Sequence, residues 1–244
     1  MLVNKILKSA LIALSLVFLV LQICQYELEA TGLRVLLLLL LTTLYCHNVK
    51  HSHILFFSFL VAFGIAEILN FIIWVIPSLS RNHIGYIYFT ANSIYIISYA
   101  LLIMHMLRSM PLLEIIKKFP YHVLIMLILD VLCVTVITGT TPSRLSFAEY
   151  SMELIYNAVI MLLLTVAFIN YIHKEDKKSI NLLMGSILIV FSEVIQLAYF
   201  YITQINLLNI FYSLFLVLAF MFFYLQSMLS YDSHEDRRLH EDIL

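Results

Sequence analysis

Charged residues are scarce in this sequence. Asp, Glu, Lys and Arg make up 12% of the 244 residues, roughly half of the share found in an average soluble domain. The net charge of −1 indicates no basic surface for nucleic acid. Hydrophobic residues reach 63%, too many to be buried in one core of this length. The composition excludes a soluble globular domain and predicts an all-α, polytopic membrane protein.

Cysteine, proline and glycine are also sparse, with three, four and five residues. Cys24, Cys46 and Cys133 lie in or beside apolar stretches, where a thiol acts as a small core side chain. The sequence shows no His and Cys spacing typical of a metal site, no apparent catalytic triad and no glycine-rich phosphate loop. Chemistry that depends on a metal or an organic cofactor is therefore not expected.

Long apolar runs fill most of the chain. A helix needs about 20 largely apolar residues to cross a bilayer, and eight segments meet or approach that length. They span residues 6–24, 33–47, 54–77, 85–107, 121–140, 151–172, 179–203 and 207–230. The connections between them are short, so no soluble domain is inserted. We expect a transmembrane domain over residues 1–230, followed by a polar cytoplasmic tail over residues 231–244.

The basic residues predict how these spans are oriented. If the N-terminus is cytoplasmic, Arg34, Arg81 and Arg144 lie on the outer side, and the other eleven of the 14 Lys and Arg residues lie on the inner side. Basic residues concentrate in cytoplasmic loops, and omitting any one span would destroy this asymmetry. We therefore expect both termini in the cytoplasm, in a bacterial inner membrane or its equivalent.

Four acidic residues lie within or at the edge of a predicted span: Glu67, Asp130, Glu153 and Glu193. An ionisable side chain at the bilayer centre costs on the order of 2.5–3.5 kcal/mol on insertion scales and is often functional. Glu153 lies near a helix start, where the helix dipole favours a carboxylate. Glu67 and Glu193 lie at similar depths, about 20 Å from the cytoplasmic ends of two outward-running helices. No Lys or Arg within a span is expected to neutralise them, and hydrogen bonding between helices is the structural alternative.

The two matched glutamates stand in a repeated pattern. Asn70 follows Glu67 by three residues, and Gln196 follows Glu193 by three, so each amide shares a helix face with its acid. Each pattern falls in the third span of a four-span half. This echo indicates two four-helix repeats with a site between them near the midplane.

The fourth span adds further polar candidates. Asn92 and Tyr95 lie on one stripe of this helix, which continues to Tyr99. His105, near the cytoplasmic end of the same span, is expected at the surface. We expect Asn92 and Tyr95 to line the same polar interior as the two glutamates.

These residues and their surroundings resemble the YhhN family, an eight-span group that includes the TMEM86 lysoplasmalogenases. The family carries a Gly-Asp pair in its third span, where this chain has Gly64 and then Glu67. Its seventh span has a glycine, an apolar run and Ser-Asp, matched here by Gly185 and by Ser192-Glu193. Further similarities, at the starts of the second and fourth spans and the end of the eighth, involve Arg34, Gly85, Phe89, Tyr224 and Gln226. The chain departs from the family in its two glutamates, which replace aspartates, and in Ser93 and Val35, which replace a histidine and a proline.

The resemblance implies a hydrolase that cleaves the vinyl ether of a lysoplasmalogen, a membrane lipid, to an aldehyde and a glycerophospho head group. Protonation at carbon followed by attack of water suits two carboxyl groups, one a general acid and the other a carboxylate that stabilises the cation or activates water. In this sequence the pair is Glu67 and Glu193, with the two roles open. The residues expected to orient water and the head group are Asn70, Asn92, Tyr95 and Gln196. No cofactor is required, and the lipid would arrive laterally from the bilayer.

A non-enzymatic alternative uses the same residues. In a transporter or a membrane sensor, mid-membrane acids act as a proton relay or a binding site. The spans contain few glycines and almost no proline, which does not favour the discontinuous helices of many transporters. A structural or assembly subunit would require only that each acid hydrogen-bonds between helices.

Overall fold

The computed structural model describes residues 2–49, 53–140 and 146–229. These residues form helices and connections, with no strand among them. The helices of this part of the chain are α1 (Leu2–Ile23), α2 (Glu27–Asn48), α3 (Ile54–Val75), α4 (Pro77–Leu107), α5 (Leu112–Lys118), α6 (Pro120–Gly139), α7 (Phe147–Lys174), α8 (Lys177–Tyr201) and α9 (Asn206–Ser227). The expected tail over residues 231–244 lies outside the described residues.

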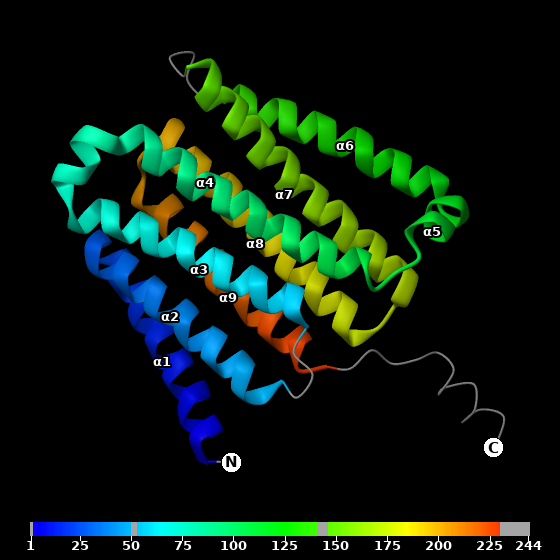
Figure 1. Ribbon diagram of the computed structural model, residues 1–244, viewed down its shortest axis with the longest axis horizontal. Helices are drawn as coiled ribbons and strands as arrows, with labels where there is room; N and C mark the ends of the chain where they lie inside the picture. Colours follow the sequence, from blue (N-terminus) through cyan, green and yellow to red (C-terminus); the bar gives the residue numbers. More distant parts are fainter. Residues whose placement is uncertain (1, 50–52, 141–145, 230–244) are drawn as a thin grey trace.

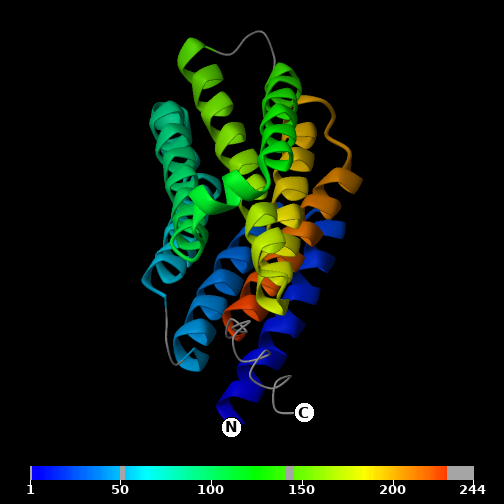
Figure 2. The ribbon, with the colours of Figure 1, turned by 90° about the vertical axis from the view of Figure 1, so that its right-hand side faces the viewer.

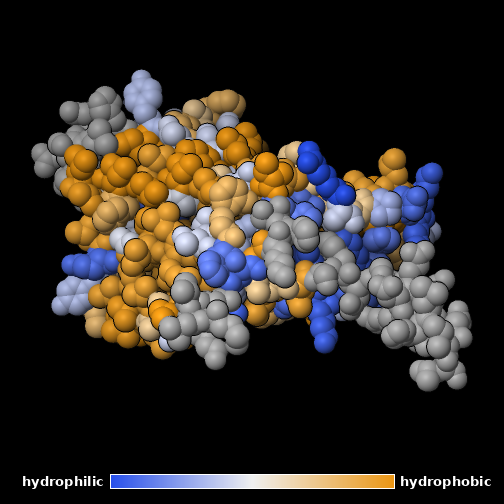
Figure 3. Space-filling model, turned by 60° about the horizontal axis from the view of Figure 1, so that its bottom comes forward, coloured by the Kyte–Doolittle hydropathy of each residue, from blue (hydrophilic) through white to orange (hydrophobic). Residues whose placement is uncertain are grey.

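Eight of these helices, all except α5, are long and apolar enough to cross a membrane. Their outward faces carry exposed apolar side chains, most densely on α6, where the exposed positions include Leu124, Ile128 and Val131. Figure 3 shows a broad hydrophobic surface along the bundle, with hydrophilic residues gathered towards its right-hand end. The chain is a multi-pass integral membrane protein, as the composition predicts.

The long helices are packed as an irregular ring. Going round the ring, α1 contacts α2, α2 contacts α3, α3 contacts α4, α4 contacts α7, α7 contacts α8, α8 contacts α9, and α9 returns to α1 and α2. Helix α6 lies outside this ring and packs mainly on α7. Figure 1 shows α1, α2, α3, α4, α7 and α6 side by side, with α8 and α9 behind them. The polar residues of seven helices can therefore face one interior.

The packing order repeats between the two halves of the chain. Consecutive long helices contact one another within α1 to α4 and again within α6 to α9. The halves meet where α4 contacts α7 and where α9 contacts α1 and, less extensively, α2. This arrangement agrees with two four-helix repeats. Helices α3 and α8, the third members, run in the same direction.

Helix boundaries differ most from the sequence-based expectation at three places. Helix α2 begins at Glu27 rather than at residue 33, because Glu27 and Glu29 occupy its first turn, where carboxylates suit the helix dipole. Helix α4 begins at Pro77, which was expected to end the preceding span, because proline is well accommodated at the first helical position. The connection from Pro111 to Pro120 contains the additional short helix α5.

Aromatic rings fill the interior of the ring of helices. Phe59 and Phe63 of α3 contact Phe220 of α9 with ring centroids 6.0 and 4.8 Å apart, and Phe59 also contacts Phe223 at 5.6 Å. All four are buried. Such rings gain dispersion energy from close packing even where no water has to be excluded.

The number of crossings places the start of α1 and the end of α9 at the same end of the bundle. Figure 2 shows this end at the bottom, where α1 begins in blue, and the red end of α9 also points downwards. We call it the N-terminal end, and the other the far end. That the N-terminal end is cytoplasmic remains a prediction from the basic residues.

One glycine is required by the packing of α8 on α9. A Cβ atom on Gly185 would lie 2.5 Å from two ring atoms of Phe223, a fully buried side chain that cannot easily move. We expect Gly185→Ala to destabilise the protein by about 1–3 kcal/mol, the usual range for overpacking, measured as unfolding in detergent. Gly64→Ala is the matched control, because a Cβ there meets no atom within 4 Å. Equal stability of the two variants would contradict the packing of α8 on α9.

Two native cysteines can test the orientation. Cys24 is exposed at the far end, after α1, and Cys46 is exposed near the N-terminal end of the bundle. With all other cysteines replaced by serine, a membrane-impermeant maleimide should label Cys24 in intact cells. Cys46 should be labelled only after the membrane is permeabilised. The reverse pattern would place the N-terminus outside.

Candidate functional site

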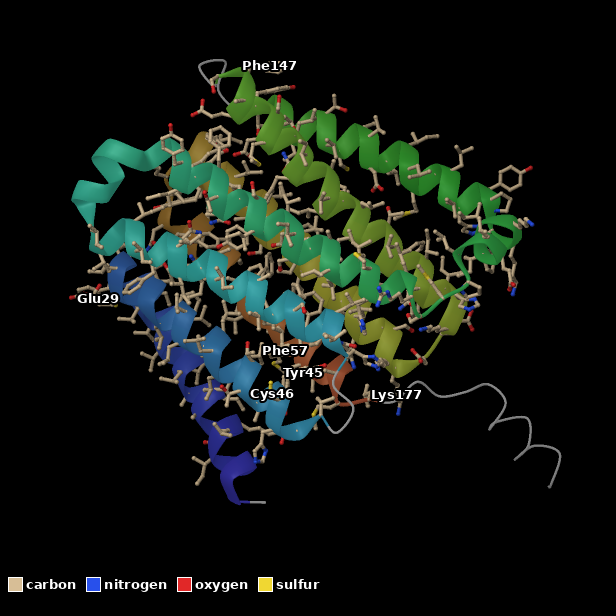
Figure 4. The ribbon with its side chains drawn as sticks, viewed as in Figure 1. Glu29, Tyr45, Cys46, Phe57, Phe147 and Lys177 are labelled. Atoms are coloured by element: carbon tan, nitrogen blue, oxygen red, sulfur yellow. The ribbon has the colours of Figure 1, made fainter. Side chains whose placement is uncertain are left out.

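A polar cavity of about 500 Å³ opens into the far half of the bundle. This volume lies within the range of small-molecule sites. Its wall comes from every helix of the ring, α1, α2, α3, α4, α7, α8 and α9, whereas α6 contributes no residue. In Figure 4, Glu29 and Phe147 mark the end of the bundle nearer the cavity, and Tyr45 and Lys177 mark the other end.

All six site residues predicted from the sequence line this cavity. They are Glu67, Asn70, Asn92, Tyr95, Glu193 and Gln196. The two glutamates come from α3 and α8, one from each half of the chain, and both side chains are buried. The structure thus places the matched acids on one polar interior and leaves neither facing lipid. Their chemical roles remain a prediction.

Glu67 forms an ion pair with Arg34. The guanidinium Nη2 of Arg34 lies 2.7 Å from Glu67 Oε2, and the glutamate is only 2% exposed. This corrects the expectation that no basic residue within a span neutralises the acids. Because α2 begins at Glu27, Arg34 lies two turns inside the helix rather than at its outer end. A charge pair of this kind lowers the cost of holding either ion away from water.

Glu193 is held by tyrosines rather than by a cation. The hydroxyl of Tyr99, from α4, donates to Oε1 of Glu193, and the hydroxyl of Tyr156, from α7, donates to Oε2 at 2.9 Å. Glu193 also lies within electrostatic range of Glu67 and Arg34. Both carboxyl oxygens therefore have a hydroxyl partner that can donate or accept a proton. The two glutamates differ in their immediate partners although they share one cavity.

Amide side chains complete the interior. Asn70 donates through Nδ2 to the hydroxyl of Tyr95 at 2.9 Å, which connects α3 to α4. Asn92 donates to the carbonyl of Tyr88 on its own helix at 2.9 Å. The carbonyl oxygen of each amide can still accept a bond from a ligand or water.

Two further carboxylates lie towards the far end of the cavity, each bonded by tyrosines. Glu153 accepts hydrogen bonds from Tyr88 at 2.7 Å and from Tyr201 at 3.1 Å. Glu27 accepts a bond from Tyr199 at 3.2 Å. These residues, with Arg34, were not predicted as part of the site. The signal for Glu27 was hidden because it precedes the apolar run, and Glu153 resembled an ordinary residue near a helix start.

Asp130 lies elsewhere. It is buried between α6 and α7, where Thr165 donates to its Oδ2 atom at 2.7 Å, and it does not line the cavity. Of the four acids at membrane depth, this one fits the structural alternative of hydrogen bonding between helices.

The charges lining the cavity favour particular ligands. The cavity is lined by four carboxyl groups, those of Glu27, Glu67, Glu153 and Glu193, and by a single guanidinium, that of Arg34. Among the described residues, no group of three or more His, Cys, Asp or Glu side chains is arranged to hold a metal ion. An organic cation or a zwitterion suits this distribution of charge, since both signs find a partner.

Comparison of the chain with protein family models, with curated proteins and with solved structures finds no match. The resemblance to the YhhN family therefore rests on residues of the third and seventh spans, such as Gly64, Gly185 and Ser192-Glu193.

The Arg34–Glu67 pair should be strongly coupled. Arg34→Met or Glu67→Gln alone leaves the other group without its partner, and we expect each to destabilise the protein by about 3–5 kcal/mol. The double variant should be destabilised by less than the sum of the two. Unfolding in detergent measures all three, and Arg108→Met, at an exposed position at the other end of the bundle, is the control. Strict additivity would show that the pair is not formed.

Proposed function

We propose that this protein is a membrane hydrolase that cleaves the vinyl ether of lysoplasmalogen-type lipids. The observation that carries the proposal is the meeting of Glu67 and Glu193 on one cavity, each with different partners. The resemblance of this chain to the YhhN family supplies the substrate class. The position of the cavity within the apolar bundle suits a substrate that enters from the bilayer.

The reaction requires one proton donor and one water. A carboxyl group transfers its proton to the vinyl carbon farther from the ether oxygen, which gives an oxocarbenium ion. Water adds to the cationic carbon and loses a proton, and the resulting hemiacetal separates into a fatty aldehyde and the glycerol hydroxyl. The proton lost from water replaces the one that the acid gave up, so the enzyme is regenerated.

The different partners of the two glutamates assign the roles that the sequence left open. We assign Glu67 as the carboxylate that faces the oxocarbenium ion or activates water, because Arg34 pairs with it directly. Glu193 contacts Tyr99 and Tyr156 instead, and we assign it as the general acid. Two carboxyl groups in unlike environments can divide acid and base work in this way.

The carboxylates towards the far end fit the head group. A lipid ammonium is attracted by carboxylates and by the faces of aromatic rings. Glu27 and Glu153, with the tyrosines that bond them, offer both, while Arg34 can face a phosphate. The glycerol portion of the lipid would then lie between the head group and the acids. The residues that orient it and the water are Asn70, Gln196, Asn92 and Tyr95.

The aromatic packing favours hydrolysis over transport. A proton-coupled transporter must open its site to each end of the bundle in turn. On the N-terminal side the cavity reaches Phe63, which packs against the buried rings of Phe59 and Phe220. A cavity that ends on such rings suits a substrate that enters and leaves at one level of the membrane.

Removal of the acid should abolish turnover. We expect Glu193→Gln to lower the release of fatty aldehyde from lysoplasmalogen by at least about 100-fold, the lower end of the range for general acid catalysis. The measurement is aldehyde formation by the purified protein in detergent or lipid nanodiscs. Asp130→Asn is the matched control, because it also changes a buried acid but lies outside the cavity.

Two results would contradict the hydrolase proposal. One is the absence of aldehyde release by folded wild-type protein, and the other is full activity of Glu193→Gln. If instead the protein drives proton-coupled solute uptake into vesicles, and Glu193→Gln abolishes it, the transporter alternative replaces the proposal.

A further inference from the structure

A second group of ionisable side chains gathers at the N-terminal end, away from the cavity. It consists of His53 before α3, His105 in the last turn of α4, Lys174 at the end of α7 and Lys178 in the first turn of α8. Two of these helices start and two end at this level of the bundle (Figure 1). Ser109 follows α4 at the same place. We call these five residues the basic cluster.

The members of the basic cluster contact one another across helices. The rings of His53 and His105 lie with centroids 5.1 Å apart, and His105 also contacts Phe56 at 5.9 Å. Lys174 donates through Nζ to the Ser109 hydroxyl at 3.0 Å. His105 lies within electrostatic range of both lysines. Four separate segments of the chain thus bring their nitrogen atoms to one place.

Two members are buried to an unusual degree. His105, which was expected at the surface, is 6% exposed because it packs under His53 and against Phe56, and Lys178 is also 6% exposed. Lysines at the ends of membrane helices normally extend their ammonium groups into water. The neighbouring Lys177 does so and projects from the bundle in Figure 4. These two members are therefore part of the packed structure, whereas Lys174 and Ser109 are half-buried and His53 is exposed.

The acidic neighbour of the basic cluster, Asp176, lies within electrostatic range of both lysines and also caps a helix. Asp176 accepts a hydrogen bond on Oδ1 from the backbone N–H of Ser179 at 2.7 Å, within the capping box that begins α8. Its other oxygen, Oδ2, is buried and has no hydrogen-bond partner among the described residues. The N-termini of α3 and α8 add positive potential at this end and the C-termini of α4 and α7 add negative potential, so the net positive charge comes from the side chains.

Helix α5 indicates the depth of this level in the membrane. It is short, its residues Leu113 and Ile116 are exposed apolar side chains, and Lys117 and Lys118 end it. This composition is typical of a helix that lies in the interface between head groups and acyl chains. The basic cluster, at the same end of the bundle, lies near the phosphates of that leaflet.

We propose that the basic cluster binds the phosphate group of an anionic phospholipid from the leaflet at the N-terminal end. Lysine ammonium and imidazole N–H groups donate to phosphate oxygens. The Ser109 hydroxyl donates to the carbonyl of Met106 and accepts from Lys174, so it positions the lysine. Basic sites between membrane helices recognise such head groups. This lipid is a bound ligand, not the substrate, and its site does not depend on the proposed hydrolysis.

The test compares lipids on the purified full chain in neutral detergent. Thermal unfolding is followed while phosphatidylglycerol, phosphatidylcholine or inorganic phosphate is added. We expect phosphatidylglycerol to raise the unfolding temperature in a saturable manner and phosphatidylcholine to have little effect. If inorganic phosphate also raises the unfolding temperature, and substitution of Lys174 or Lys178 weakens that effect, the ligand is a soluble phosphate. If inorganic phosphate has no such effect, the ligand is the lipid.

Single substitutions distinguish binding at the basic cluster from non-specific attraction of the lipid to surface charge. Lys178→Gln and Lys174→Gln should each raise the half-saturating concentration of phosphatidylglycerol about fivefold, whereas Lys178→Arg should keep it. Lys177→Gln removes the same charge from the exposed neighbour and should shift it less than twofold. If Lys178→Gln does not fold, Lys174→Gln, at a less buried lysine, carries the test. Equal effects of the Lys177 and Lys178 substitutions, or equal stabilisation by phosphatidylcholine, would overturn the proposal.

Discussion

A charged side chain in the apolar part of a bilayer has no water to solvate it, and the arrangement of this protein follows from that constraint. The chain places Arg34, Glu67 and Glu193 inside the ring of helices, where other side chains replace water. Arg34 and Glu67 neutralise each other at 2.7 Å, and Glu193 takes hydrogen bonds from two tyrosines. These contacts join α2 to α3, α4 to α8 and α7 to α8. The polar groups therefore also fix how the helices pack. In lipid, where apolar helices have little reason to associate through the hydrophobic effect, such contacts contribute to specificity.

The fold was largely accessible from the sequence, whereas the site was accessible only in part. Runs of apolar residues determine the spans, because a bilayer demands that length and composition, and all eight were found. Glu67 and Glu193 were found because an acid at membrane depth is conspicuous. The sequence did not predict the ion pair of Arg34 with Glu67. The two glutamates at the start of α2 interrupt the hydrophobic pattern, so the pattern predicts a helix that begins later, with Arg34 at its outer end. The order of packing was also hidden, since helices that are apolar on most faces give weak evidence of which side meets a neighbour. That α6 lies outside the ring while α7 takes its place beside α4 depends on side-chain fit.

The two ends of the bundle have opposite electrostatic character. Towards the far end, Glu27 and Glu153 carry carboxylates bonded by tyrosines, whereas the N-terminal end gathers lysines and histidines. The aromatic packing of Phe59, Phe63 and Phe220 separates the two regions. Because rings conduct neither ions nor water, chemistry at one end is insulated from ligands at the other. A lipid held by the basic cluster would therefore act on the cavity through helix positions, since α3, α4, α7 and α8 take part in both.

The proposed repeat accounts for how one scaffold can hold two acids for the two tasks that the proposed hydrolysis requires. Glu67 and Glu193 occupy corresponding helices, α3 and α8, and each is contacted by the second helix of its own half. In the first half that helix supplies Arg34, and in the second it supplies Tyr156. The positions of α3 and α8 bring both carboxyl groups to one cavity, and the exchange of a guanidinium for a hydroxyl makes their surroundings unequal. A symmetric pair would offer two groups of the same proton affinity, whereas acid–base catalysis needs a donor and an acceptor at the same time. Under the proposed hydrolysis, the difference between Arg34 and Tyr156 is what makes one glutamate the proton donor and the other the acceptor.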